Sequence, residues 1–253
     1  MQSLMLIGIG TGNPDHLTGQ AAAAMRQADL ILIPRKGADK SDLAELRLQI
    51  CRTVLGDSGP AIAEFDLPVR DTGGDYVDGV TLWHDAIAAA WQQAVAAHLP
   101  DAATVALLIW GDPSLYDSSL RIAARLKPAP KIRVIPGITS LQALTAAHAI
   151  ALNEIGAPVL VTTGRRLRDQ GLPDDVDTAA IMLDGQCSFQ SLNAGEYDIW
   201  WGAYLGMAEE VLIAGPLDQV SAQILDTRAR ERLRHGWIMD IYLLRRRAGA
   251  HPD

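Results

Sequence analysis

The sequence predicts an α/β protein of two α/β domains, and three segments carry this prediction. The apolar run Val105–Ile109 shows no polar alternation and ends in a Gly-Asp-Pro turn, which is typical of a parallel strand buried on both faces. The segment Leu4–Ile9 leads through a glycine-rich turn into a helix, and Lys131–Ile135 repeats this design. A chain of 253 residues is long for a single core. We therefore expect two domains, 1–127 and 128–253, divided at the proline-rich Lys127–Pro130.

Composition and charge narrow the functional class. Hydrophobic residues make up 49% of the chain and charged residues 21%, as in ordinary globular enzymes. The net charge of −8 argues against a nucleic acid partner. The two cysteines, Cys51 and Cys187, form no CxxC or Cys/His cluster, so we expect no metal site. This cysteine usage is typical of a protein in the reducing cytoplasm. No apolar stretch approaches the ~20 residues that cross a membrane, and the N-terminus lacks the positive region of a signal peptide.

The glycine-rich turn Gly8–Gly12 follows the first expected strand and precedes a helix over Leu17–Ala28. Such a β-loop-α-β unit usually binds a phosphate or a nucleotide. Two features disfavour a plain NAD site. The third glycine comes two residues after the second, and the next strand, Asp29–Ile33, ends in Pro-Arg-Lys where a dinucleotide fold needs an acidic residue. A glycine turn that serves only to start the helix is the alternative interpretation.

The Gly-Asp-Pro turn is the second candidate for ligand binding. In open α/β sheets, ligands bind beyond the carboxyl ends of the strands, which is where this turn lies. Gly111 lets a ligand approach the backbone, Asp112 adds a carboxylate and Pro113 stiffens the turn. An ordinary turn that ends a strand is again the alternative.

Apolar and basic patterns predict the remaining elements. Trp83, Ile87, Trp91 and Val95 recur every four residues, which predicts a helix over about 80–98 with this stripe in the core. The acidic, glycine-rich segment 71–79 before it is a candidate lid. Further helices are expected over 115–126, from Thr139 and Ser140 to about 152, and around 217–234, and further strands over 158–163, 178–183, 197–205 and 237–244. Four arginines near the end of the last helix, Arg228, Arg230, Arg232 and Arg234, complement its dipole and are interpreted as structural.

Two groups of cations suit an anionic substrate. Arg35 and Lys36 follow the second expected strand, at the functional edge of the sheet. Arg165 and Arg166 belong to an expected basic loop, 164–169, which would bind carboxylates by bidentate pairing. Solvated surface charges are the alternative interpretation.

Taken together, four motifs resemble those of the tetrapyrrole methylase family, S-adenosylmethionine-dependent enzymes of corrin and sirohaem synthesis. In chain order they are Leu6–Thr18, Gly111–Pro113, Val134–Ser140 and the weaker Glu209–Leu217, and the resemblance covers nearly the whole chain. The segment Pro34–Leu43 resembles the branch that methylates ring carbon C1 of precorrin-5 and releases the extruded acetyl group as acetate. The resemblance thus implies a cytoplasmic, homodimeric methyltransferase of cobalamin synthesis.

In that family, S-adenosylmethionine lies in a cleft between the two domains, held largely by backbone groups, and S-adenosylhomocysteine is the product. Carried over by motif, the expected cofactor-binding residues are Gly111, Asp112, Leu115, Thr139, Ser140, Met182, Leu183, Tyr204, Leu205 and Gly236. The sequence departs from the usual motif at the last three. Thr11 and Pro14 are expected on the substrate side, together with Arg35, Lys36, Arg165 and Arg166.

Methyl transfer from a sulfonium requires mainly alignment, because the electron-rich ring is itself the nucleophile. No Ser-His-Asp or Cys-His set is evident, and the residue that activates water for acetyl loss is not assigned. Asp184, Glu154 and His84 are conceivable bases, although a structural role explains each of them better. Two alternatives stay open. One is a methyltransferase of the same fold acting on another corrin carbon, on diphthine or on ribosomal RNA; the other is a non-catalytic nucleotide-binding regulator.

Overall fold

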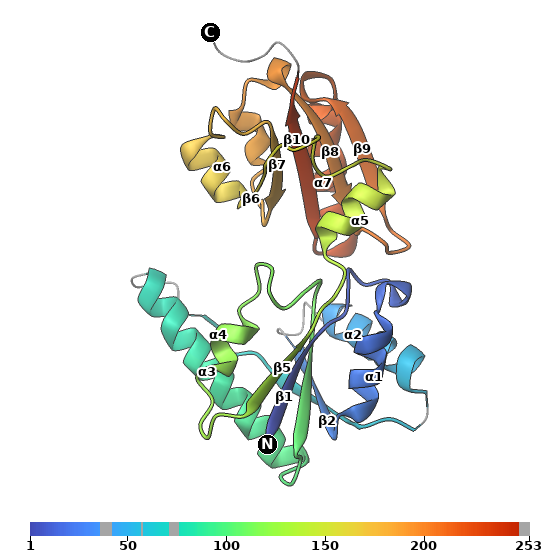
Figure 1. Cartoon of the computed structure of the whole chain (residues 1–253), viewed down its shortest axis with the longest axis vertical. Helices are drawn as coiled ribbons and strands as arrows, with labels where there is room; N and C mark the ends of the chain where they lie inside the picture. The colour runs from blue at the N-terminus through green and yellow to red at the C-terminus, as the bar shows by residue number, and fades with distance from the viewer. Residues whose placement is uncertain (36–41, 57, 71–75, 248–253) are drawn as a thin grey trace. The chain divides into compact units, whose positions relative to one another are not determined.

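The structure of the chain, a computed structural model, describes residues 1–35, 42–56, 58–70 and 76–247 (Figure 1). The chain divides into two compact units, Met1–Thr139 and Ser140–Asp253. Each unit holds one five-stranded sheet. The two α/β domains that the sequence predicts are therefore present as two separate sheets with their own helices.

The first unit contains an all-parallel sheet in the order β3-β2-β4-β1-β5. Its strands are β1 (Ser3–Gly8), β2 (Leu30–Arg35), β3 (Ala61–Asp66), β4 (Thr104–Ile109) and β5 (Lys131–Ile135). The helices are α1 (Gly19–Gln27), α2 (Asp42–Leu55), α3 (Tyr76–His98) and α4 (Ser119–Ala123), with the short 3-10 turn η1 (Pro14–His16) after β1.

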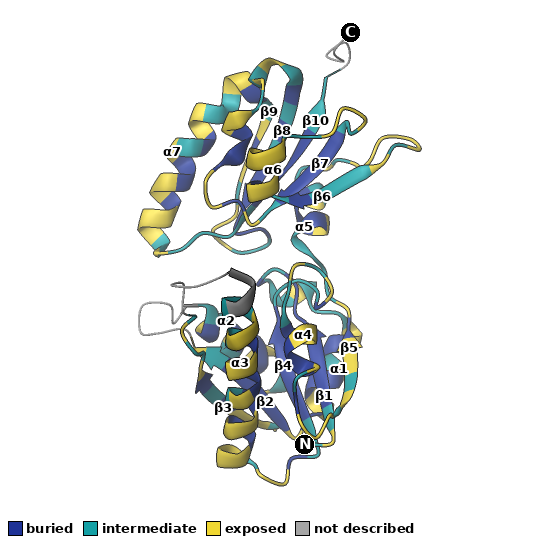
Figure 2. Cartoon of the chain, turned by 90° about the vertical axis from the view of Figure 1, so that its left-hand side faces the viewer, coloured by how far each residue is buried: buried dark blue, intermediate teal, exposed yellow. Residues whose placement is uncertain are grey.

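Helices cover both faces of this sheet, which explains why its central strands lack polar alternation. Successive residues of β1 enter two different apolar clusters. Leu4 and Leu6 pack with α3 and α4, whereas Met5 and Ile7 pack with α1 and α2. Figure 2 shows β1, β2 and β4 buried along most of their length, while α3 exposes one face. The predicted stripe on α3 is confirmed, since Ile87, Trp91 and Val95 lie in the first cluster and Trp83 packs against it.

The second unit contains a mixed sheet in the order β6-β7-β10-β8-β9, in which only β6 and β7 pair in parallel. Its strands are β6 (Val159–Thr163), β7 (Thr178–Met182), β8 (Tyr197–Ala203), β9 (Val211–Pro216) and β10 (Asp240–Arg246). The helices are α5 (Ser140–Ala147), α6 (Gly164–Gln170) and α7 (Leu217–His235), with 3-10 turns η3 (Ser188–Ser191) and η4 (Ala194–Glu196).

The helices of the second unit also lie on both faces of their sheet. Leu167 of α6 and Ile224 of α7 join one cluster with alternate residues of the strands. Helix α5 packs against β8 and β10, and its Leu144 adjoins Gly202. Because Gly202 alternates with Trp201 of the cluster, α5 lies on the opposite face.

The expected domain boundary at Lys127–Pro130 is corrected by the pairing of β5. This strand, which we expected to open the second domain, pairs with β1 along its length and completes the first sheet. The prolines therefore lead into an edge strand of the first unit, and the division falls between Thr139 and Ser140. A proline cluster marks the end of an element equally well in a linker and before an edge strand.

Several expected element bounds also change. The basic segment 164–169 is not a loop, because Thr163 caps it by accepting from the Arg166 amide and Leu167 is buried, so α6 forms there. Helix α4 is much shorter than the expected 115–126, and α5 ends at Ala147 rather than near 152. Helix α3 begins at Tyr76, inside the candidate lid, and residues 71–75 of that segment lie outside the described residues, as does Lys36.

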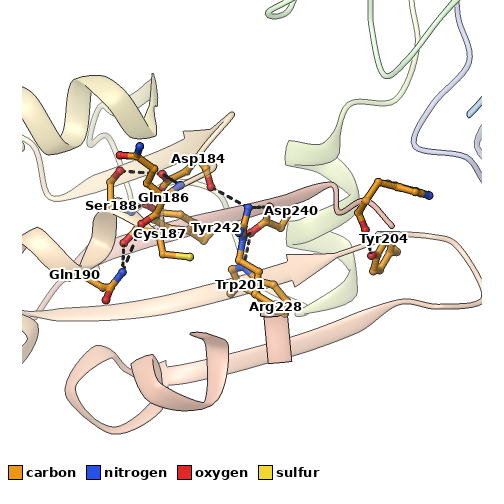
Figure 3. A network of polar contacts seen from close by, with 11 residues as sticks. Asp184, Gln186, Cys187, Ser188, Gln190, Trp201, Tyr204, Arg228, Asp240 and Tyr242 are labelled. Atoms are coloured by element: carbon orange, nitrogen blue, oxygen red, sulfur yellow. Dashed lines mark hydrogen bonds and ion pairs between the residues drawn. The ribbon is translucent and has the colours of Figure 1, made fainter. Parts of the chain in front are cut away.

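The structural role expected for Arg228 is confirmed by a buried ion pair. Its Nε lies 2.8 Å from Asp240 Oδ2, and both side chains are about nine-tenths buried (Figure 3). The same carboxylate accepts from Trp201 Nε1, and the Arg228 guanidinium also donates to the Asp184 carbonyl oxygen. Arg228 thereby joins α7 to the ends of β7 and β10. Arg230 and Arg234 pair with Glu231, and Arg232 lies exposed.

Replacing Arg228 by Ala should lower the free energy of unfolding by about 3–5 kcal/mol, because Asp240 is then left buried without its counter-ion. Arg232→Ala, on the exposed side of the same helix, is the matched control and should change it by less than about 0.5 kcal/mol. Urea denaturation of the two variants measures the difference. Equal effects would show that the buried pair does not stabilise the second unit.

Candidate functional site

The loops after β1, β4 and β5 meet backbone to backbone at the carboxyl edge of the first sheet. The Gly111 amide donates to the Gly10 carbonyl oxygen at 2.7 Å, which joins the first two loops. A Cβ on Gly137 would lie 2.1 Å from the Gly111 carbonyl oxygen, and one on Gly8 would lie 2.6 Å from the Gly137 nitrogen. Three motifs that are far apart in sequence thus form one floor, and its glycines are needed because the backbones touch.

Asp112 fastens two of these loops together. Its Oδ2 accepts from the Gly137 amide at 2.9 Å, and its Oδ1 accepts from the Ser114 amide at 2.8 Å and from the Ser114 hydroxyl. Partial burial raises the pKa of the Asp112 carboxyl, but the hydrogen bonds from Ser114 and Gly137 outweigh it and leave the pKa below its ordinary value. The carboxylate is therefore ionised at neutral pH and bridges the β4 and β5 loops. Leu115, half-buried, completes this turn, its amide donating to the Asp112 carbonyl oxygen.

The glycine-rich loop after β1 is held by short-range polar contacts. The Asn13 side chain accepts from the Asp15 amide, and the Thr18 hydroxyl caps α1 by accepting from the Ala21 amide. The Thr11 hydroxyl lies 3.0 Å from Nδ1 of His16. Thr11 and Pro14, the expected substrate-side residues, are both half-buried on this loop.

Behind the β4 turn lies a buried cation that sequence reasoning missed. Arg47 of α2 donates from Nε to the Leu108 carbonyl oxygen at 3.0 Å, and its guanidinium carbon lies 5.0 Å from the centre of the Trp110 ring. Burial lowers the pKa of Arg47 to about 10, against the opposing effect of Asp117, so the side chain stays charged at neutral pH. It supports the strand end from which Gly111 and Asp112 project. Nothing in the helical pattern of α2 distinguishes this arginine from a surface residue.

The expected substrate cations lie on two different elements. Arg35, at the carboxyl end of β2, forms a half-exposed ion pair with Glu64, whose oxygen lies 3.0 Å from its Nε. Arg165 and Arg166 lie exposed in the first turn of α6. Arg35 therefore needs to leave, or to share, its carboxylate partner before it binds a further anion.

Thr139 and Ser140, the expected hydroxyl pair, are half-buried where β5 leads into α5. Thr139 belongs to the floor, since its Cα would lie 3.6 Å from a Cβ on Gly111. Ser140 is the first residue of α5 and belongs to the second unit. The pair therefore lies where the two units join in sequence.

In the second unit, the expected residue Met182 ends β7, and Leu183 directly follows the strand. Leu183 has φ of 54° and is 67% exposed, which is uncommon for a branched apolar residue. The next residue, Asp184, anchors the turn. It accepts from Tyr242 Oη at 2.6 Å, from the Ser188 amide and hydroxyl, and from the Gln186 amide (Figure 3). Such strain persists only where the surroundings enforce it, and it often marks a functional site.

Tyr204, Leu205 and Gly236 lie around the end of α7. Tyr204 also has a positive φ, of 51°, and is only 2% exposed, while Leu205 is buried. The Tyr204 hydroxyl donates to the Trp237 carbonyl oxygen at 2.5 Å, and its ring packs edge-on against Trp237. Gly236 ends α7 with φ of 73° and is exposed. Tyr204 therefore fixes the loop after β8 to the end of α7.

The three residues that we considered as bases are already held by hydrogen bonds, by an ion pair or by burial. Asp184 already accepts four hydrogen bonds. Glu154 pairs with Arg245 at 2.7 Å. His84 is 5% exposed on α3, and burial first, then the charges of Arg125 and Arg121, lower its pKa. Each residue is thus engaged or enclosed in a way that does not suit the activation of a water molecule.

Among the described residues, no group of three or more His, Cys, Asp or Glu side chains is arranged to hold a metal ion. In the same part of the chain, no helix combines the length and the apolar character that a membrane span requires.

Gly137→Ala should destabilise the first unit by about 3 kcal/mol, because the new methyl group displaces the backbone of Gly111. Gly19→Ala is the matched control. A Cβ on Gly19, at the start of α1, meets nothing within 4 Å, so this change should be neutral or slightly stabilising. Denaturant unfolding of both variants checks the contrast; wild-type stability in Gly137→Ala would contradict the close contact of the loops.

Comparisons with known proteins identify the family of the chain. The family model for Tetrapyrrole (Corrin/Porphyrin) Methylases matches residues 3–221. Precorrin-6A synthase [deacetylating] of Sinorhizobium sp is 47% identical, over 98% of this chain and 97% of that protein. The crystal structure of a cobalamin-synthesis-related protein (CobF) from Corynebacterium diphtheriae is 37% identical, with a TM-score of 0.79 over 97% of this chain and 98% of that one. A uroporphyrin-III C-methyltransferase from Thermus thermophilus, complexed with S-adenosylhomocysteine, shares the fold at 17% identity, with a TM-score of 0.57 over 96% of each chain. The chain belongs to the tetrapyrrole methylase family.

Proposed function

We propose that this chain is an S-adenosylmethionine-dependent methyltransferase that methylates C1 of precorrin-5 and releases the extruded acetyl group as acetate, giving precorrin-6A in cobalamin synthesis. The observation that carries this proposal is the 47% identity to a deacetylating precorrin-6A synthase over 98% of the chain. The match extends along nearly the whole chain, so it supports more than a shared fold.

The floor of the first unit is the proposed binding site for the cofactor. Its glycines keep side chains out of the space at the strand ends, where a Cβ on Gly111 would approach Thr139. We assign the methionine part of S-adenosylmethionine to Gly111, Asp112 and Leu115, and the hydroxyl contacts to Thr139 and Ser140. Met182, Leu183, Tyr204, Leu205 and Gly236 of the second unit are assigned to the adenosine. Leu183 offers an exposed apolar side chain for direct contact with the adenosine. Tyr204 and Leu205 are buried, so we assign them to supporting the loop that contacts it.

The methyl-transfer step needs little from the chain beyond binding and orientation of the two reactants. When bound, S-adenosylmethionine supplies an electrophilic methyl group to the ring carbon. The chain aligns the two reactants, for which well-ordered loops are needed. The Asp112–Gly137 bond and the Asp184 turn supply that order in the two units.

The substrate carries many carboxylates, so its binding needs cations. Arg35, Lys36, Arg165 and Arg166 are the proposed partners, with Thr11 and Pro14 on the substrate side of the glycine loop. A homodimer and a cytoplasmic location are proposed as well, and both rest on the resemblance to the family. The net charge of −8 disfavours a nucleic acid substrate.

The proposed activity is tested by incubating the purified chain with precorrin-5 and methyl-labelled S-adenosylmethionine, and scoring label in the ring and acetate in solution. We expect both, in equal amounts. Label without acetate would indicate a methyltransferase for another position and would contradict the proposal. Neither product, despite thermal stabilisation by S-adenosylhomocysteine but not by NAD or ATP, would point to a binding protein without this activity.

Arg166→Glu should raise the dissociation constant for precorrin-5 about tenfold or more, because a cation becomes an anion beside a polyanion. Binding of S-adenosylhomocysteine should stay unchanged. Lys131→Glu is the matched control, since Lys131 begins β5 at the opposite, amino edge of the first sheet. Titration calorimetry measures both ligands, and an unchanged precorrin-5 constant in Arg166→Glu would remove this residue from the substrate site.

A further inference from the structure

The imidazole ring of His16, which contacts Thr11, has no part in the chemistry proposed above. Both side chains are half-buried on the loop that leaves β1, and Thr11 Oγ1 lies 3.0 Å from His16 Nδ1. The His16 backbone amide donates to the Asn13 carbonyl oxygen, and a Cβ on Gly10 would lie 2.8 Å from the His16 Cβ. The loop therefore holds the base of the imidazole in place while the ring stays partly open to solvent.

The contact with Thr11 has a consequence for the other ring nitrogen. When Nδ1 carries the proton, it donates to the Thr11 hydroxyl oxygen, and Nε2 is left with a free lone pair. Within the described part of the chain, Nε2 of His16 forms no hydrogen bond or ion pair. A general base of this kind has one ring nitrogen that donates to a positioning group and a second ring nitrogen whose lone pair is free to accept a proton.

The pair also lies beside the floor assigned to the cofactor. Thr11 directly follows Gly10, whose carbonyl oxygen accepts from the Gly111 amide. This contact links the glycine loop to the turn that contains Asp112, all within the first unit. A base at His16 is thus on the same strand edge as the site where the ring would be methylated.

We propose that His16, oriented by Thr11, is the general base that activates water for the release of acetate. This inference rests on the proposed function. A proton passes from water to Nε2 as the water oxygen bonds to the acetyl carbonyl carbon. The bond from that carbon to the ring then breaks, and its electron pair enters the conjugated ring, where it serves the carbon that is methylated. Acetic acid leaves with the water oxygen, and His16 later returns its proton to solvent.

Three variants test the role of the ring. In His16→Asn, the amide nitrogen replaces Nδ1 as a donor to Thr11 but supplies no base, so acetate release should fall about a hundredfold or more. Thr11→Val removes the orienting hydroxyl and should cause a smaller loss. His98→Asn, at the exposed end of α3, is the matched control and should release acetate at the wild-type rate. All variants should bind S-adenosylhomocysteine with the wild-type dissociation constant in calorimetry.

Chemical rescue separates a base from a structural residue. His16→Ala removes the ring but keeps the Cβ that packs on Gly10, and added imidazole should restore part of its acetate release. Loss of activity in His16→Ala without rescue, with weakened S-adenosylhomocysteine binding, would assign His16 to loop structure and overturn the inference. Wild-type acetate release in His16→Asn would overturn it as well. If the wild-type chain itself releases no acetate from precorrin-5, the proposed function fails instead.

Discussion

The hydrogen bond between the Asp112 carboxylate and the Gly137 amide ties together the two loops on which the candidate site depends. It joins the strand ends of β4 and β5, which are not neighbours in the sheet, across the end of β1 between them. The strand ends approach so closely that glycine is the only residue that fits at Gly8 and Gly137. A floor made of backbone presents amide and carbonyl groups with little conformational freedom, which suits a cofactor bound mainly through backbone contacts.

In the second unit, buried polar side chains, and not close backbone contacts, hold the strand ends in place. Its mixed sheet places polar side chains inside, where Asp184, Tyr242, Arg228 and Asp240 satisfy one another. Burial, followed by the charge of Asp184 and the hydrogen bond to it, raises the pKa of Tyr242 well above its ordinary value, so the phenol remains a donor at physiological pH. Removing any member leaves a buried polar group without a partner, which costs more than the bond contributes. Asp184, which this network anchors, directly follows Leu183, whose backbone is left-handed and whose apolar side chain is exposed.

The parts of the fold that the sequence predicts are those with a strong local pattern. The unbroken apolar run of β4 and the four-residue stripe of α3 indicate burial directly, and both are confirmed. The division of the chain could not be read from Lys127–Pro130, because the pairing of β5 with β1 is set by a partner more than a hundred residues away. Likewise, the basic segment after β6 becomes a helix through a cap at Thr163 and one buried leucine, Leu167.

For the candidate site, the motifs indicated which loops matter but not how they touch. The contact between Thr11 and His16 depends on a loop conformation, and the position of Arg47 under Trp110 depends on tertiary packing, so neither carries a sequence signal of its own. A crystal structure with S-adenosylhomocysteine tests the central claim most directly. We expect the methionine part of the ligand against the backbone of Gly111–Leu115, above the Asp112–Gly137 bond. A ligand bound elsewhere, with that turn empty at saturating concentration, would contradict it.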